Sequence, residues 1–253
     1  MRLYEITFSP TGGTEKAADM LLKAFPEAYE KISLLECQKA YGEYSFQKED
    51  VCVIAVPSYG GRVPVTASER LAQMKGNGAA CILLCVYGNR AFEDTLTELK
   101  QVAEEAGFVP RAAAAVIAEH SIMRQFASGR SDASDEKELF EFGAKIRERL
   151  LSGEKSEELQ VPGNVPYKER HTSPMVPKVT DACVKCGRCV RECPVAAIDG
   201  ETFAAEKEKC ISCMRCIAVC PEGARALDKE LLAGLVSRLE KVCSGHRENQ
   251  LFL

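Results

Sequence analysis

The sequence predicts an α/β fold in which a five-stranded, doubly wound parallel sheet is followed by a small α+β segment and a C-terminal helix. Three observations support this prediction. Apolar runs at 51–56 and 79–87 are continuous rather than alternating, as expected for strands buried on both faces of a parallel sheet. Helical patterns separate these runs along the chain. Finally, eight closely spaced cysteines between 183 and 220 indicate a second, separate domain.

Strands and helices are expected to alternate through the first domain. Residues 2–8 alternate into a strand, Pro57 ends the third strand, and Gly107 ends the amphipathic helix that precedes the fifth strand. The expected strands are 2–8, 28–35, 51–56, 79–87 and 108–118, and the expected helices are 15–25, 63–75, 92–106 and 136–151.

The chain is expected to divide into four parts: 1–158, the first domain; 159–180, a proline-rich linker; 181–227, the cysteine-rich domain; and 228–253, a C-terminal helix and tail. Proline-rich linkers are semi-rigid. Asp228 is a candidate N-cap for the last helix. Six apolar residues at helical spacing predict a face that docks on a domain or on a partner chain: Leu231, Leu232, Leu235, Val236, Leu239 and Val242.

Composition narrows the function classes. The net charge of −4 and the pI near 5.6 argue against nucleic acid as the default partner. No apolar run approaches the length of a membrane span, and the first residues, which include Glu5, do not resemble a signal peptide. We therefore expect a soluble, cytoplasmic protein that binds neither nucleic acid nor membrane.

The cysteines form two identical quartets of the pattern C-x2-C-x2-C-x3-C-P. Three closely spaced thiolates can surround three corners of a cubane iron–sulfur cluster, and the fourth cysteine, followed by Pro, ligates the other cluster of a two-cluster protein. The pattern therefore predicts two [4Fe–4S] clusters with crossed ligands. One cluster takes Cys183, Cys186, Cys189 and Cys220, and the other takes Cys193, Cys210, Cys213 and Cys216.

Zinc sites and disulfides are the two other interpretations of these cysteines. Structural zinc sites use separated pairs of Cys or His, and the quartets have no His nearby. Disulfides require an oxidising compartment, and nothing in the sequence indicates export. The segment closely resembles bacterial two-cluster ferredoxins. Four basic residues within the cysteine loops, Lys185, Arg188, Arg191 and Arg215, are expected to face an acidic protein surface, either of the first domain or of an external redox partner.

A glycine- and hydroxyl-rich loop at 9–14 joins the first strand to the first helix. Backbone N–H groups at the start of a helix bind phosphate, and glycines let the backbone approach closely. No Lys follows Gly13, so the loop is not a nucleotide P-loop and suits a terminal monophosphate. The alternative is an ordinary strand–helix turn in which Thr14 is an N-cap.

Two further loops follow the third and fourth expected strands. Ligands of parallel sheets bind at the carboxyl ends of the strands, where all three loops meet. Together these loops make residues 1–155 resemble flavodoxin. The resemblance implies an FMN whose phosphate is held by Ser9, Thr11, Gly12, Gly13 and Thr14. It implies that the isoalloxazine is bracketed by Pro57, Ser58, Tyr59, Gly60, Gly61 and Arg62, and by Tyr87, Gly88, Asn89, Arg90 and Phe92.

Particular roles follow from the same resemblance. Tyr59 would stack on the flavin, and a Gly60 or Gly61 peptide could turn its carbonyl towards N5, because glycine adopts the required backbone cheaply. Arg62 and Arg90 either place positive charge at the flavin edge, which tunes its potential, or lie on a solvated rim. His120 and the polar stretch at 121–135 are expected to form a loop near the end of the fifth strand.

The whole chain resembles the fused flavodoxin–ferredoxin iron–sulfur flavoproteins of anaerobes. The resemblance implies an electron carrier between two [4Fe–4S] clusters and FMN, with a redox protein as donor or acceptor. No G-x-G-x-x-G dinucleotide motif is present. The alternative is a reductase of a small substrate, such as a quinone, disulfide or tetrapyrrole, fed through the clusters; a redox sensor is a weaker third hypothesis. A homodimer is also an open expectation.

Overall fold

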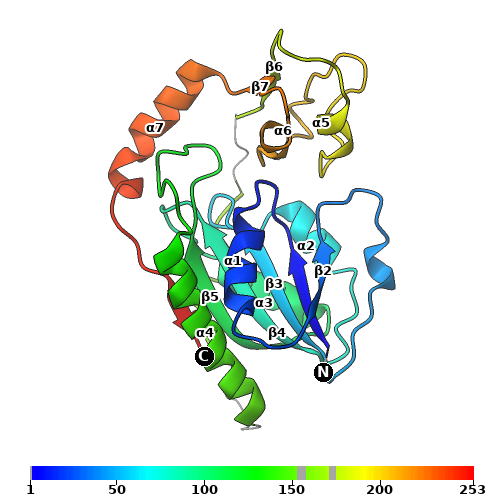
Figure 1. The fold of residues 1–253 in the computed structure, drawn as a ribbon, viewed down its shortest axis with the longest axis vertical. Coiled ribbons are helices and arrows are strands. Elements are labelled where there is room, and N and C mark those ends of the chain that lie inside the picture. The colour runs from blue at the N-terminus through cyan, green and yellow to red at the C-terminus, as the bar shows by residue number, and fades with distance from the viewer. Residues whose placement is uncertain (1, 153–157, 171–174) are drawn as a thin grey trace.

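The computed structural model describes residues 2–152, 158–170 and 175–253. One large sheet lies between two layers of helices, and a small cysteine-rich part sits above it (Figure 1). The strand order of the sheet is β2-β1-β3-β4-β5-β8. The first five strands are parallel, and the order 2-1-3-4-5 is that of flavodoxin-like folds. The predicted fold class is confirmed.

The strands of this sheet are β1 (Leu3–Thr7), β2 (Tyr29–Ser33), β3 (Val51–Pro57), β4 (Ala80–Tyr87), β5 (Val109–Ile117) and β8 (Gln250–Phe252). Five strands were expected, and β8 is the sixth. It pairs antiparallel with β5, with Leu251 opposite Ala114. The C-terminal tail thus returns to the first domain and covers a sheet edge that would otherwise expose unpaired backbone groups.

Helices cover both faces of the sheet. On one face lie α1 (Gly13–Leu22) and α4 (Ala133–Ser152), whose buried residues join a cluster with Val53 and Leu84. On the other face lie α2 (Val65–Leu71) and α3 (Thr95–Glu105), packed with Ile54 and Leu83. Each central strand is therefore buried on both sides, which explains its continuous apolar sequence. A short 3₁₀ helix, η1 (Tyr41–Glu43), follows β2.

The linker lies along α3 where it is described. Asp94 accepts hydrogen bonds from the backbone N–H groups of Asn164 (2.9 Å) and Lys168 (2.8 Å), and Arg62 donates to the carbonyl of Lys168 at 2.5 Å. These bonds fix 158–170 on the first domain. Residues 153–157 of the expected first domain and 171–174 of the expected linker lie outside the described residues.

The cysteine-rich part has little regular structure. Its two strands, β6 (Lys178–Val179) and β7 (Arg225–Ala226), pair antiparallel. Two single-turn helices, α5 (Arg188–Arg191) and α6 (Arg215–Ala218), each contain the third cysteine of a quartet. Each is preceded by a left-handed residue, Gly187 or Met214. The repeat in sequence is therefore also a repeat in structure.

The last helix, α7 (Lys229–Cys243), begins where the sequence predicted. The Asp228 carboxylate caps it by accepting from the N–H groups of Glu230 (3.1 Å) and Leu231 (3.2 Å). Leu232, Leu235, Val236 and Leu239 pack against Met123 and Phe126 of the loop after β5. The prediction was wrong for Leu231 and Val242, whose side chains are 50% and 47% exposed, because the docking stripe is narrower than the apolar pattern. Among the helices of the described ranges, none has the length and apolar character to cross a membrane.

Candidate functional site

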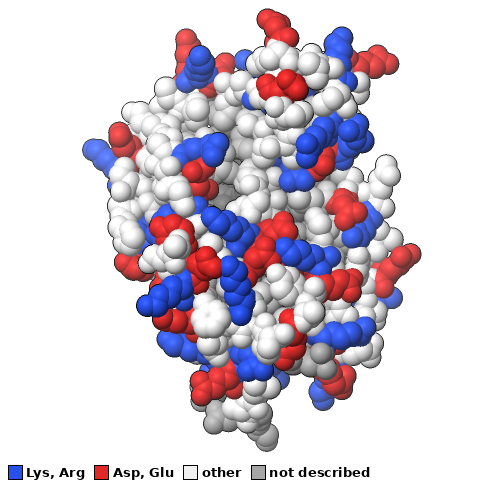
Figure 2. Space-filling model, in the orientation of Figure 1, with Lys and Arg blue, Asp and Glu red and all other residues white. Residues whose placement is uncertain are grey.

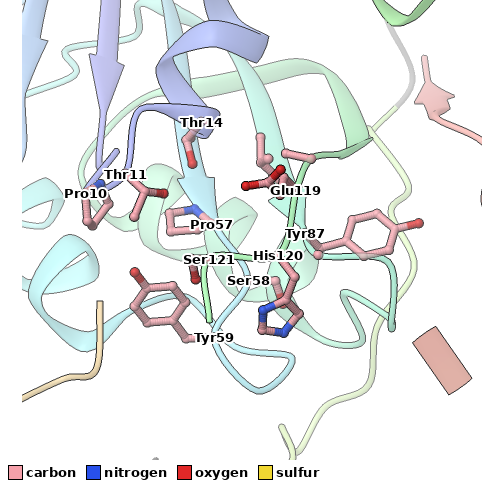
Figure 3. A pocket seen from close by; sticks show the side chains of 14 residues that line it. Pro10, Thr11, Thr14, Pro57, Ser58, Tyr59, Tyr87, Glu119, His120 and Ser121 are labelled. Atoms are coloured by element: carbon pink, nitrogen blue, oxygen red, sulfur yellow. The ribbon is translucent and has the colours of Figure 1, made fainter. Parts of the chain in front are cut away.

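A cavity opens at the carboxyl ends of the strands, where the three predicted loops meet. Figure 3 shows that side chains from the loops after β1, β3 and β5 face it. The predicted residues among its lining are Thr11, Gly13, Thr14, Pro57, Ser58, Tyr59, Tyr87 and Gly88. The tertiary structure therefore brings the three loops together at one site.

The loop at 9–14 leads directly into α1. Gly12 is the N-cap residue, with φ of 88°, a left-handed conformation that favours glycine. Ser9 is buried, and its Oγ accepts from the N–H of Glu15 at 2.9 Å. The first N–H groups of a helix have no acceptor within the helix, so those of Gly13 and Thr14 are placed for an anion. Gly12 rather than Thr14 is the N-cap residue, and the Ser9 hydroxyl accepts from an N–H in the first turn of the helix.

Tyr59 is held over the cavity by a tight turn. Tyr59 and Arg62 exchange backbone hydrogen bonds of 2.9 and 3.2 Å. Between them, Gly60 and Gly61 both have positive φ, at 61° and 86°, as a type I′ turn requires. A Cβ at Gly61 would also collide with the Glu93 side chain. The glycine pair therefore sets the position of Tyr59.

Arg62 and Arg90 do not line the cavity. Arg62 forms a two-pronged ion pair with Glu98, at 2.7 and 2.9 Å, and its side chain is only 12% exposed. Arg90 pairs with Glu93 at 2.9 and 2.8 Å. Hydrogen bonding to these carboxylates raises the pKa of both arginines. Each positive charge is thus compensated locally by a carboxylate.

Asn89 and Phe92 also lie away from the cavity lining. The buried Asn89 amide donates to the carbonyls of Cys243 (2.6 Å) and Gly245 (2.7 Å), so it anchors the end of α7. Phe92 packs edge-on against Tyr87, with ring centroids 5.3 Å apart. In the described contacts, Asn89 joins the loop after β4 to the end of α7, and Phe92 joins that loop to Tyr87 of β4.

Six lining residues were not among the predicted site residues: Pro10, Val86, Ala118, Glu119, His120 and Ser121. The last three follow β5, whose carboxyl end lies beside that of β4. His120 fits closely because Gly88 has no side chain; a Cβ there would lie 2.7 Å from the ring. The ring Nδ1 accepts from the N–H groups of Ile122 (3.1 Å) and Met123 (3.2 Å). The position of these residues after the fifth expected strand is the signal that could have identified them.

The charge states of two of these residues follow from their surroundings. Burial lowers the pKa of His120 to about 4, so the ring is neutral at physiological pH. A hydrogen bond from Arg124 lowers the pKa of Glu119, which is therefore ionised. The cavity thus presents hydroxyls, a neutral imidazole and one carboxylate that is already paired.

A second cavity lies in the cysteine-rich part. Its lining includes Cys183, Cys186, Cys189 and Cys220. These four residues, which we call the outer set, come from both quartets in the crossed combination that the spacing predicts. Arg225 also lines this cavity, is only 4% exposed, and donates to the Sγ of Cys189 at 3.2 Å. A buried cation beside four thiols suits a group of negative charge.

The other four cysteines, Cys193, Cys210, Cys213 and Cys216, form the inner set. Burial raises the pKa of Cys213 to about 12, and Cys193, Cys216 and Cys210 raise it further. Such mutual effects require the four sulfurs to lie close together. Burial likewise raises the pKa of Cys216 to about 11, against an opposing effect of Arg225. Bound iron would supply the positive charge that thiolates need in this environment.

The donor chemistry of both sets therefore fits a cluster with cysteine ligands. All thirteen cysteines of the chain are free thiols. Within the described ranges, no three His, Cys, Asp or Glu side chains converge closely enough to hold a single metal ion. The outer set surrounds a space rather than a point.

The inner set lies against the first domain. Arg215, beside Cys216, donates to the carbonyl of Pro10 at 3.2 Å. The Cys37 thiol donates to the carbonyl of Cys193 at 3.0 Å. Tyr59 is close enough to Cys213 for the pKa of its phenol to be raised, first by burial and then by that thiol. The inner set therefore adjoins the loops that form the first cavity.

Several solved flavodoxins are similar to the first part of this chain. A flavodoxin from Streptococcus pneumonia TIGR4 is 17% identical over 58% of this chain and 99% of its own, with a TM-score of 0.42. A flavodoxin from the domain Archaea is 12% identical over 60% of this chain and 99% of its own, with a TM-score of 0.44. The two-electron reduced flavodoxin of Megasphaera elsdenii is 21% identical over 56% of this chain and 98% of its own, with a TM-score of 0.39.

A search of curated proteins found no match. Residues 175–221 match the model of the family described as 4Fe-4S dicluster domain, which spans both cysteine quartets. The chain therefore joins a domain of flavodoxin-like fold to a 4Fe-4S dicluster domain.

Proposed function

We propose that the protein is an electron-transfer iron–sulfur flavoprotein that passes electrons between two [4Fe–4S] clusters and FMN. One observation carries the proposal: the inner cysteine set adjoins the loops of the first cavity, at Pro10 and Tyr59. An electron leaving the inner cluster would therefore arrive beside the flavin. FMN accepts one or two electrons, so it supplies the step between one-electron and two-electron chemistry.

The first cavity offers FMN suitable donors at the carboxyl ends of the strands. The N–H groups that begin α1 would hold the phosphate together with Thr11 and Thr14. Tyr59 offers an aromatic ring on the other side of the cavity, as Figure 3 shows. In this arrangement Gly12, Gly60 and Gly61 shape the loops, and Ser9 caps the helix.

The other predicted flavin residues receive a supporting role in this proposal. Arg62 forms an ion pair with Glu98, and Arg90 forms one with Glu93. Asn89 donates a hydrogen bond to the end of α7, and Phe92 packs against Tyr87. They would fix the loops that carry Tyr59 and Tyr87 rather than contact the flavin. A flavin held in this way has no unpaired arginine beside it among the described residues of the cavity lining, so its reduced form would not gain stability from such a charge.

The outer set offers the entry point for a redox partner. Cys186 is exposed, as are Lys185, Arg188 and Arg191 around it, and Val184 is 64% exposed. An acidic redox protein would fit this face, because opposite charges steer association. On the face seen in Figure 2, charges of both signs are interspersed, so steering would come from this local group.

Anaerobic purification of the full chain tests the proposal. We expect about eight iron and eight sulfide per chain, as two [4Fe–4S] clusters require, and one FMN. The variant Cys186→Ser should lower the iron content, whereas Cys37→Ser, which changes a thiol outside both sets, should leave it unchanged. A wild-type preparation with zinc in place of iron, or without flavin, would contradict the proposal.

A second candidate function rests on the residues that follow β5. His120 and Ser121 line the first cavity beyond the predicted flavin residues, so a small acceptor could approach the flavin there. The protein would then transfer two electrons and two protons to, for example, a quinone, forming the hydroquinone. Reduced protein mixed with a soluble benzoquinone tests this: Ser121→Ala should slow a true substrate reaction, and an unchanged rate would favour the carrier.

A further inference from the structure

We propose that Arg225 raises the reduction potential of the outer cluster above that of the inner cluster, so that the first electron accepted by the pair resides away from the flavin. This inference rests on the proposed function, because it concerns the two clusters. The reduced cluster carries one more electron than the oxidised one, and no bond forms or breaks.

The sequence repeat makes Arg225 conspicuous. Arg225 follows Cys220 by the same interval as Ile198 follows Cys193. Ile198 is a buried, uncharged residue in an apolar cluster that contains Cys193 and Cys216 of the inner set and Cys189 of the outer set. Where one half of the repeat places this aliphatic side chain, the other half places a guanidinium that donates a hydrogen bond to Cys189.

The position of the guanidinium is fixed by the backbone around it. Arg225 begins β7 and pairs with Val179 of β6. One Nη atom lies 3.5 Å from the carbonyl of Pro177, and the other donates to the Sγ of Cys189 at 3.2 Å. Only 4% of the residue is exposed. Among the described residues, no carboxylate forms an ion pair with Arg225.

A buried cation without a carboxylate partner is costly. A cluster with four thiolate ligands carries a net negative charge, and that charge increases on reduction. Arg225 would therefore stabilise the reduced cluster more than the oxidised one. Cluster potentials respond to net charge and to hydrogen bonds to the sulfur ligands, and Arg225 supplies both to the outer set. The charge of Arg225 also reaches Cys210 and Cys216 of the inner set, whose raised pKa it opposes, so the hydrogen bond to Cys189 is what favours the outer set.

Arg191 provides a matched comparison. It also lies beside the outer set, donating to the carbonyl of Cys186 at 3.3 Å, but its side chain is exposed. Solvent and salt screen an exposed charge far more than a buried one. Removing either arginine subtracts the same formal charge near the same cluster. Any difference in the potential of the outer cluster between the two variants therefore reports the effect of burial and of the hydrogen bond to sulfur.

The test is a redox titration of the full chain, followed by electron paramagnetic resonance, with iron and sulfide measured for every sample. In Arg225→Met, at the wild-type midpoint of the outer cluster, the ratio of reduced to oxidised cluster should fall about tenfold, which is 59 mV for one electron. Arg191→Met should change that ratio less than about threefold, and Arg225→Lys should fall between the two because it retains charge. The flavin midpoint should not move.

The order of the clusters is tested by a ligand change. Cys186→Ser should alter the resonance that appears first on reduction, and Cys213→Ser the one that appears second; the reverse assignment would overturn the proposal. Arg225→Met with clusters intact and midpoints unchanged would also overturn it. If that variant loses its clusters, the midpoint of the outer cluster is measured in Arg225→Gln instead, because this variant removes the charge but retains N–H donors. A wild-type chain without iron would instead refute the proposed function, before any titration.

Discussion

Arg215 donates a hydrogen bond to the backbone carbonyl of Pro10, at 3.2 Å, and so joins the inner cysteine loop to the loop that precedes α1. Arg215 also pairs with Glu192. A second contact also joins the cysteine-rich part to the first domain. Arg70 of α2 donates to the carbonyl of Leu34 in the first domain and to that of Pro194 in the cysteine-rich part, both at 2.6 Å. The two domains are thus connected by hydrogen bonds beside the proposed path of the electrons.

Replacing Arg215 should weaken this connection. A hydrogen bond to a charged group contributes about 1.5–3 kcal/mol. Arg215→Met should therefore lower about tenfold either the fraction of molecules in which the cysteine-rich part contacts the first domain, or the rate at which the clusters reduce the flavin. Stopped-flow absorbance of flavin reduction measures the rate. Arg188→Met, which removes an exposed arginine from the other loop, is the control. Equal rates in the two variants would show that the contact has no role in transfer.

Gly88 should tolerate no side chain. A Cβ there would lie 2.7 Å from the His120 ring, so Gly88→Ala must displace the histidine or the loop. We expect the free energy of unfolding to fall by about 1–3 kcal/mol and FMN binding to weaken. Thermal unfolding and quenching of flavin fluorescence measure the two effects. Gly200→Ala is the control, because a Cβ at that position would meet no atom within 4 Å; similar losses in both variants would refute the steric explanation.

Glu5 should make stability depend on pH. Its side chain is fully buried on β1 beside Asp19 and 3.5 Å from Lys31, and burial raises its pKa to about 8. As the pH rises, the folded state therefore keeps the Glu5 proton until about pH 8, whereas the unfolded state, with a pKa of 4.5, releases it at a lower pH. This contribution to stability is complete below about pH 4.5 and is lost as the pH rises towards 8.

The variant Glu5→Gln isolates this effect. Gln cannot ionise, so the difference in melting temperature between the variant and wild type should grow from pH 5 to pH 8 in favour of the variant. The expected gain at pH 8 is on the order of 4 kcal/mol. The pKa of about 8 already includes the opposing effect of the Lys31 ammonium, which stabilises the ionised Glu5. A difference that stays constant with pH would show that Glu5 ionises normally.

Charge at the outer cysteine loop should control reduction by an acidic redox protein. Lys185→Glu reverses a charge beside the exposed Cys186, so the bimolecular rate should fall several-fold at low ionic strength and converge with wild type at high salt. Lys145→Glu, on the exposed side of α4, supplies the same change of charge far from the cysteines. Stopped-flow reduction at several salt concentrations measures both. A wild-type rate that does not depend on salt would remove the electrostatic docking surface.

Much of the fold could be predicted because its signals are local. Continuous apolar strands such as β3 and β4 must be covered on both faces, and Asp228 marks the start of α7 with a side chain that caps it. The tail strand β8 could not be predicted, because three residues carry no distinctive period and their pairing with β5 depends on where α7 leads the chain. Leu231 and Val242 were placed on the docking face for the same reason: the pattern shows apolar spacing but not the width of the surface it meets.

The candidate site likewise has some features that the local sequence predicts and others that only the folded chain determines. The loops at 9–14 and 57–62 could be found because glycine marks backbone that other residues adopt only with strain. The partner of Arg62 could not, because Glu98 lies on α3 and meets Arg62 only in the folded chain, whereas Glu93 is only three residues from its partner Arg90. Likewise His120 enters the cavity because β5 lies beside β4, which no local pattern states.

By itself the sequence determined the alternating strands and helices, the glycine-rich loops and the two cysteine quartets, since all of these depend on spacing along a short stretch of chain. Only the tertiary structure decided that the inner set faces Pro10 and Tyr59, that the tail adds a strand to the sheet, and that the buried Arg225 points at Cys189. These relationships join residues far apart in the chain. They are set by how whole domains pack, which no local period encodes.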